Sequence, residues 1–345
     1  KDKLPNIING NTPKNYEFCQ EGDIAFADAS EDTNEVAKAV EFYKLHGKDV
    51  ICGLHTIHGR DNQQKTVVGY KGYAFSSTAF HHQIRIIAQG TKIYSINSKN
   101  FSECYIGIPS KEEQTKIATL LRLIDERIAT QNKIIEDLKK LKSAIIENVF
   151  DDKHSERLQL DNVGSYIRGL TYSSNDVVEH GGTLVMRSNN IVNGSLLDYN
   201  NNVVFVNKQM SAEQQLQNGD IVICMANGSS SLVGKSSFYD GNCHSPITVG
   251  AFCGIYRSKE PIVKWLFQTN KYRRYIWNSL QGGNGAIANL NGEDILNMSF
   301  SIPNAPIKDT CVKMLTSVDS ALENNMSLCA LYTLQKQHLL RQMFI

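Results

Sequence analysis

Among the residues of this chain, the pair His55-x-x-His58 has the spacing most similar to that of metal ligands. No Cys or carboxylate lies at a matching spacing, and zinc usually takes four ligands of these types. We therefore interpret GLHTIHGR as a polar loop and expect no bound metal. The eight cysteines form no C-x-x-C pair, so neither a zinc site nor a disulfide framework is indicated. They stand at positions 19, 52, 104, 224, 243, 253, 311 and 329.

Sequence motifs for catalysis are missing. The chain has no Walker A segment, no G-x-S-x-G, no H-E-x-x-H and no glycine-rich nucleotide fingerprint. It also has no Pro-Pro pair, which excludes the Asn-Pro-Pro-aromatic and Asp-Pro-Pro-aromatic tetrapeptides of amino-methyltransferases. We expect a chain that performs no chemistry and binds no cofactor.

One segment is strongly basic, although the net charge of the whole chain is only +1. Residues 257–274 carry six cations against the single Glu260, with aromatic residues between them. The six are Arg257, Lys259, Lys264, Lys271, Arg273 and Arg274. Lys and Arg side chains can contact phosphates, and some can reach bases. An amphipathic helix with a solvated basic face explains the segment equally well, so both interpretations stay open.

Exposed polar side chains with donors and acceptors are the groups that can read base edges. In the first part of the chain the candidates are His55, Thr56, His58, Arg60, Asn62, Gln63, Gln89, Thr91 and Lys92. In the second part they are Arg187, Ser188, Asn189, Asn227, Ser229, Ser230, Lys235, Lys271, Arg274, Asn284 and Asn289. Polar loop residues more often face solvent, so only a minority are expected to touch a ligand.

These candidates lie in two irregular regions, each followed by a long helical stretch. The first stretch, 110–150, has neither Gly nor Pro and predicts about eleven turns, roughly 60 Å of helix. The irregular regions carry strand-like runs between Gly, Asn and Ser turns. These runs are DIAFA, DVICGL, GTLVM, NVVFV, DIVICM and AFCGIY, and residues 261–280 are predicted to be helical. Each region is expected to be a mixed α/β domain without a regular β-α-β-α rhythm.

The second half of the chain repeats the first. Residues 92–110 align with 286–304 at an offset of 194, and the alignment continues through both long stretches to Phe150 and Phe344. EGDIAF (21–26) corresponds to NGDIVI (218–223) at an offset of 197. If positions 10–12 correspond to 169–171, the offset there is only 159, so the first copy is abridged near its start. We therefore expect two domains, each followed by one long helix.

Apolar residues alternate at spacings of four and three in both stretches, which is typical of a coiled coil. The first seam contains Ile117, Leu121, Ile124, Ile128, Gln131, Ile135, Leu138, Lys142, Ile145 and Val149. The second contains Cys311, Leu315, Val318, Leu322, Asn325, Cys329, Tyr332, Lys336, Leu339 and Met343. Because both seams have polar residues at the same two points, we predict antiparallel pairing about a pseudo-two-fold axis. The alternative is that each helix only fills the core of its own half.

The first long stretch resembles the conserved region of the DNA-specificity subunit of type I restriction-modification systems. The matching features are Ile108-Pro109, Glu112-Glu113-Gln114, the Leu-x-x-x-Asp turn at 121–125 and the Lys-rich stripe at 138–142. EGDIAFADAS and AQGTKIYSI also resemble the target-recognition domains of that family. The second stretch departs from the pattern, because NAPIKDT replaces the Glu-Glu-Gln segment.

The resemblance implies two target-recognition domains, 1–109 and 153–303, and two conserved spacer helices, 110–152 and 304–345. Each domain would read one half of a bipartite site in double-stranded DNA, and the helices would set the unread spacer. The chain would also scaffold two methyltransferase (modification) subunits and then restriction subunits, and it would perform no catalysis. The abridged first domain leaves open whether that half-site is still read.

No apolar run is long enough to span a bilayer, and the N-terminal residues lack an apolar signal core, so a cytoplasmic protein is expected. Residues 1–105 hold 12 Lys/Arg against 12 Asp/Glu, and residues 157–302 hold 11 against 10. The lone chain is therefore expected to bind DNA weakly. Two alternatives remain: a domain derived from a methyltransferase or nuclease, which would bind S-adenosylmethionine, and a coiled-coil adaptor that binds only protein.

Overall fold

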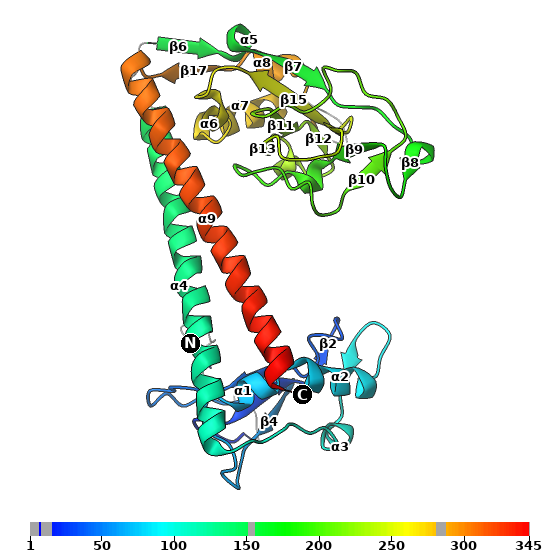
Figure 1. Ribbon diagram of the computed structural model, residues 1–345, viewed down its shortest axis with the longest axis vertical. Coiled ribbons are helices and arrows are strands. Elements are labelled where there is room, and N and C mark those ends of the chain that lie inside the picture. The colour runs from blue at the N-terminus through cyan, green and yellow to red at the C-terminus, as the bar shows by residue number, and fades with distance from the viewer. Residues whose placement is uncertain (1–6, 8–15, 151–155, 281–287, 345) are drawn as a thin grey trace. The chain divides into compact units, whose positions relative to one another are not determined.

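The computed structural model describes residues 7, 16–150, 156–280 and 288–344. The chain forms two compact units: residues 1–135 with residues 324–345, and residues 136–323. Both units combine strands with helices, which confirms the predicted mixed α/β class (Figure 1). Each unit includes part of both long helices, α4 (Lys111–Val149) and α9 (Ala305–Met343).

An antiparallel sheet in the order β3-β1-β4 forms the centre of the first unit. Its strands are β1 (Ile24–Ala27), β3 (Ala39–Glu41) and β4 (Thr56–Gly59), and β2 (Ala29–Ser30) pairs separately with β5 (Tyr94–Ser95). The short helices are α1 (Lys71–Ala74), α2 (Thr78–Ile87) and α3 (Ser98–Phe101). Ile24 and Phe26 share one face of β1 and pack in one core with Phe80 and Ile84 of α2.

The second unit contains two four-stranded sheets, in the orders β13-β11-β15-β7 and β14-β9-β10-β8. The first sheet comprises β7 (Gly164–Arg168), β11 (Ile221–Cys224), β13 (Ser236–Phe238) and β15 (Cys253–Ser258). The second comprises β8 (Val177–Val178), β9 (Thr183–Met186), β10 (Val204–Val206) and β14 (Ile247–Val249). Two further pairs are β6 (Glu156–Gln159) with β17 (Ser299–Ile302), and β12 (Ala226–Asn227) with β16 (Ala288–Asn289). The α-helices are α5 (Leu160–Val163), α6 (Val263–Leu266), α7 (Asn270–Leu280) and α8 (Gly292–Leu296).

Strand β11 explains why the sequence of the second unit has an uninterrupted apolar run. Ile221 and Ile223 belong to one buried cluster, together with Trp265 of α6. Val222 and Cys224 belong to another, which includes residues of β9 and β14. A strand that is covered on both faces needs apolar residues at every position rather than at alternate ones.

In each unit, the parts of α4 and α9 that belong to it run antiparallel. In the first unit Leu121 packs in one cluster with Leu340 and Phe344, where the C-terminal, red end of α9 lies in Figure 1. In the second unit Ile146 packs in one cluster with Leu315. Each of the predicted seam positions is buried or half-buried. Gln131 and Asn325 meet side chain to side chain, with the Gln131 amide donating.

The start of α4 shows what the Glu-Glu-Gln segment does. The Ser110 hydroxyl accepts the Glu113 N–H at 3.2 Å, which caps the helix. Gln114 is fully buried: its amide accepts the Val67 N–H at 2.9 Å and donates to the carbonyls of Lys65 and Pro109. Gln114 therefore fixes α4 to the preceding domain. In α9 the corresponding Lys308 pairs with Glu260 at 3.2 Å, so a different contact replaces the missing segment.

The predicted helical character of residues 261–280 is confirmed by α6 and α7, which are separate because the Thr269 hydroxyl accepts the Tyr272 N–H and starts α7. One local prediction was wrong. In DVICGL, no strand forms: Ile51 makes only an isolated bridge, to Phe18. The counterpart of this run in the second unit is β14, which pairs with β9. The segment that contains β9 falls where the first copy is shorter, so DVICGL has no such partner.

Candidate nucleic-acid interface

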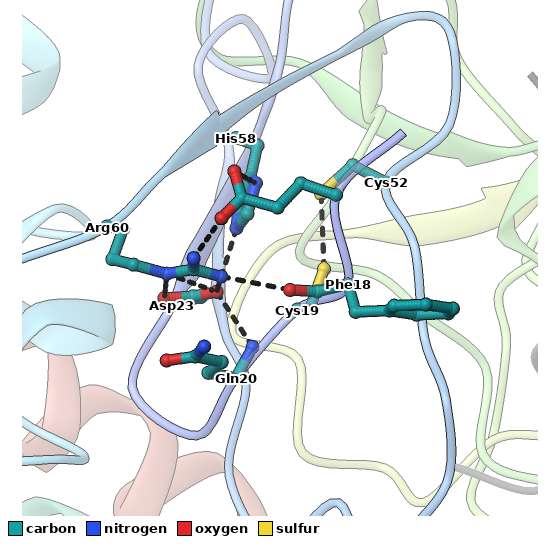
Figure 2. Close-up of polar contacts among 8 residues, drawn as sticks. Phe18, Cys19, Gln20, Asp23, Cys52, His58 and Arg60 are labelled. Carbon is teal, nitrogen blue, oxygen red and sulfur yellow. Dashed lines mark hydrogen bonds and ion pairs between the residues drawn. The ribbon is translucent and has the colours of Figure 1, made fainter. Parts of the chain in front are cut away.

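A buried carboxylate organises the β3-β1-β4 sheet of the first unit (Figure 2). Asp23 is 3% exposed, and it accepts hydrogen bonds from Arg60 at 2.6 Å, from the Gln20 N–H at 2.7 Å and from His58 Nε2 at 2.9 Å. Arg60 also donates to the Phe18 carbonyl at 2.9 Å and contacts Glu17. Burial alone would raise the pKa of Asp23, but these hydrogen bonds outweigh it and lower the pKa to about 2.

The β13-β11-β15-β7 sheet of the second unit has the same Asp–Arg arrangement, at the sequence offset that relates EGDIAF to NGDIVI. Asp220 is 2% exposed and accepts from Arg257 at 2.6 Å and from the Gln217 N–H at 2.7 Å. Arg257 also donates to the Gln215 carbonyl at 2.7 Å, just as Arg60 donates to residue 18. The hydrogen bond to Asp220 raises the pKa of Arg257. We call these two groups the Asp–Arg clamps: Asp23 with Arg60, and Asp220 with Arg257.

Several side chains that the sequence predicted to contact DNA are instead bonded to the clamp carboxylates. His58 and Arg60 are 17% and 22% exposed and hold Asp23, and Arg257 is engaged in the same way. Lys264 lies 3.6 Å from the Phe238 ring centroid and pairs with Asp319 at 2.8 Å. The basic segment is thus divided into cations held inside the fold and cations on the surface, where Lys259, Arg273 and Arg274 are exposed.

The remaining candidates of the first unit lie at the surface around β4 and β5. The His55 side chain is 90% exposed, and Thr56 donates its hydroxyl to the Gly53 carbonyl. Asn62, Gln63, Gln89, Thr91 and Lys92 are exposed. The Asp28 N–H donates to the His55 carbonyl, and the Ile96 N–H donates to the Asp28 carbonyl. Asp28 therefore links the start of β4 to the segment that carries the Gln89–Ser95 bridge.

In the second unit, several candidates meet at one edge. Asn227 donates to the Ser188 hydroxyl at 3.3 Å and accepts the Ser229 N–H at 3.0 Å. Asn289 lies opposite Ala226 in the β12–β16 pair, which adds it to the same edge. Arg187 and Asn189 are exposed nearby in the chain, and Arg187 donates to the Asn202 carbonyl. Asn284 lies outside the described residues.

Ser230 and Lys235 line a second feature, a cleft of about 400 Å³ whose other wall is α7. Lys271 and Arg274 are residues of α7. Arg273, which belongs to the basic segment identified in the sequence, and Trp277, which sequence reasoning did not select, also line this cleft. Trp277 was missed because only polar and charged side chains were considered as candidates; its place one helical turn after Arg273 was the available signal.

In the described ranges, no group of three or more His, Cys, Asp or Glu is placed to hold a metal ion. No helix in the same ranges is long and apolar enough to cross a membrane.

The comparisons with known proteins agree on one family. Residues 3–140 match the model for the type I restriction modification DNA specificity domain. The EcoKI specificity subunit of Escherichia coli K12 is 35% identical over 155 residues, and the StySPI specificity subunit of Salmonella potsdam is 34% identical over 153. Each alignment covers 42% of this chain and 31% of the relative. The chain therefore spans about a third of the length of the curated relatives that it matches.

Solved structures extend the similarity in fold to nearly the whole chain. The S subunit of a type I restriction-modification system from M. genitalium matches with a TM-score of 0.61 at 16% identity, over 95% of this chain and 84% of that one. A chain from a study of assembly and conformational transition of the type I R-M system matches with a TM-score of 0.55 at 13% identity, over 97% and 84%. The resemblance to type I DNA-specificity subunits that the sequence predicted is confirmed.

Proposed function

We propose that this chain is the non-catalytic specificity component of a type I restriction-modification complex. Its two domains would each read half of a bipartite site in double-stranded DNA. The paired helices would set the distance between the half-sites and dock two methyltransferase subunits, to which restriction subunits are added. The support is the specificity-domain match, together with contacts that recur between the two halves of the chain.

The observation that carries this proposal is a reciprocal pair of ionic contacts. Lys142 pairs with Asp319 at 2.7 Å, and Lys336 pairs with Asp125 at 2.6 Å. The offset of 194 between the long stretches turns the first pair into the second, with the two helices exchanged. Residue i contacting j while j contacts i is the signature of a two-fold interface. Gln131 contacts Asn325, its own counterpart at the same offset, as expected at the axis of such an interface.

The strand registers support the internal repeat as well. Ile24 lies opposite Glu41 and Gly59, while Ile221 lies opposite Phe238 and Tyr256. Every pair in one sheet becomes a pair in the other when 197 is added to both members. Duplex DNA is a regular helix. Two similar domains held at a fixed distance would therefore bind two half-sites separated by a fixed number of base pairs.

The base-reading surface would consist of the exposed candidates rather than the clamps. In the first unit these are the residues at the His55 end of β4 and in the Gln89–Lys92 turn. In the second unit they are the Ser188, Asn227 and Asn289 edge. His58 and Arg60 would act by holding the β1–β4 sheet, because the buried Asp23 engages both.

The test is to map methylated bases in DNA from cells that express this chain with its modification subunit, against cells that lack the chain. A gapped, two-part motif that disappears with the chain is expected. A one-part motif would mean that the first domain no longer reads DNA. Identical methylation in cells with and without the chain would contradict the proposal and favour an adaptor that binds only protein. Binding of S-adenosylmethionine by the purified chain would instead favour an enzyme-derived domain.

A further inference from the structure

We propose that the cleft between residues 230–235 and α7 in the second unit binds the sugar–phosphate backbone of duplex DNA. Lys235 and Arg273 would contact phosphates, and Trp277 would lie against the adjoining deoxyribose. This inference rests on the proposed function and deepens it, since it assigns a binding surface to one domain and a chemical role to each of its side chains.

The two walls of the cleft are held together by direct contacts. Tyr272 of α7 donates its hydroxyl to the Gly234 carbonyl at 2.8 Å. Gly234 has φ +80°, and a Cβ at this position would lie 2.7 Å from the Ile276 side chain. Only glycine therefore lets the loop approach α7 this closely. The backbone positions of Lys235 and of α7 are thus set by the fold before any ligand binds.

The described residues that line the cleft suit a polyanion. They include Lys235 and Arg273 together with the neutral donors Ser230, Ser231 and Asn193, and no carboxylate is among them. Within the part of the chain that the structure describes, no ion pair involves Lys235, Arg273 or Arg274. Charge complementarity therefore favours a phosphate backbone as the occupant.

Trp277 is large and 63% exposed, whereas the other tryptophan, Trp265, is 2% exposed. It stands on α7 one turn after Arg273, so the two side chains share one face of the helix. An indole beside a guanidinium can cover a sugar while the cation meets the neighbouring phosphate. That pairing explains why this surface carries both residue types.

The corresponding surface of the first unit has a different chemistry. Aligning Phe80 with Tyr272 and Ile84 with Ile276 places Arg85 at the position of Trp277. Lys38, the counterpart of Lys235, pairs with Glu35, and Arg85 is 3.5 Å from the Asn34 amide oxygen. The loop also carries Glu31 and Asp32. The same backbone arrangement thus carries an acidic loop in the first unit and a basic cleft lined by no carboxylate in the second.

The first experiment uses the two tryptophans as reporters. Acrylamide quenching of the full chain should detect exposed Trp277 against buried Trp265, and duplex DNA at low salt should protect Trp277. The variant Trp277→Phe leaves only the buried reporter, so the DNA-dependent change should vanish. Fluorescence anisotropy of labelled DNA run in parallel reports binding independently of tryptophan.

The second experiment separates backbone contact from base reading. Lys235→Gln and Arg273→Gln should each reduce the slope of log affinity against log salt by about one, equally for every DNA sequence. The methylated motif in cells should stay unchanged. Lys38→Gln in the first unit is the matched control, and its slope should remain near that of the unaltered chain.

The outcomes distinguish this inference from the proposed function. DNA binding by anisotropy without protection of Trp277, or with unaltered salt slopes in both Gln variants, overturns the cleft while leaving the specificity role intact. A changed methylated motif in Arg273→Gln also overturns it, because the residue would then read bases. No DNA binding even with the modification subunit present overturns both.

Discussion

The first and second domains share a set of paired strands but differ in the strands and loops that connect them. Strand registers, an Asp–Arg clamp and a backbone turn of positive φ recur, the last at Ala37 and Gly234. The second domain adds β8, β9 and β10, which fall in the segment where the first copy is abridged. The comparison shows that the clamps and strand registers are the constant part of this fold, while the connecting loops differ in length and in charge.

The largest expected effect comes from removing the carboxylate of either clamp. Asp23→Ala and Asp220→Ala should each lower the free energy of unfolding by about 3 kcal/mol, because the Arg and a backbone N–H lose a buried partner. Denaturant unfolding of both variants measures the two losses side by side. A loss below about 1 kcal/mol in one variant would mean that the clamps are not equivalent.

A smaller and unequal effect is expected from the two reciprocal lysines. The Lys142 side chain is 8% exposed, whereas that of Lys336 is 27% exposed. Lys142→Ala should cost about 2–3 kcal/mol and Lys336→Ala about 1 kcal/mol, since solvent screens the more exposed pair. Thermal or denaturant unfolding gives both values. Equal losses would indicate that both pairs have the same environment in solution.

Acid should weaken the first clamp in a defined range. The folded pKa of Asp23, about 2, lies below its ordinary value of 3.8, so its stabilisation is complete above that ordinary value. It is lost as the pH falls from about 4 toward 2, and it amounts to about 2 kcal/mol. The difference in unfolding free energy between the unaltered chain and Asp23→Asn should shrink over this range. A difference that is constant with pH would contradict the assigned partners.

The smallest effect concerns the polar contact in the helix seam. Replacing Gln131 and Asn325 together by Leu should raise the unfolding free energy by about 1 kcal/mol, because apolar seam residues pack better than amides. Either single Leu variant should instead lower it, since one amide loses its partner. If the double variant is less stable than the unaltered chain, the amide contact does more than fix register.

Features with a local period could be predicted from the sequence. The seam from Ile117 to Leu138 follows from spacing alone, and the strand DIVIC follows from its continuous apolar run. The repeat was visible in EGDIAF and NGDIVI because both copies kept the Gly-Asp turn. These signals depend only on neighbouring residues, so they can be recognised before the fold is known.

Contacts between distant residues could not be predicted in this way. Asp23 and Arg60 are far apart in the sequence, and only strand pairing brings them together, so Arg60 looked like a free polar loop residue. DVICGL has the composition of a strand but lacks the neighbour that its counterpart β14 has. Trp277 was overlooked because its exposure depends on how α7 is oriented, and residues 261–280 gave no sign of the break at Thr269.

The division of the chain into units has a consequence for its biosynthesis. The second unit is continuous in sequence, whereas the first needs residues 324–345, which are made after the whole of the second. During translation the second unit can therefore fold while Tyr70, Leu121 and their neighbours still lack Leu340 and Phe344. The part made first is completed last, and its apolar surface is exposed to chaperones and proteases until the C-terminal turns of α9 leave the ribosome.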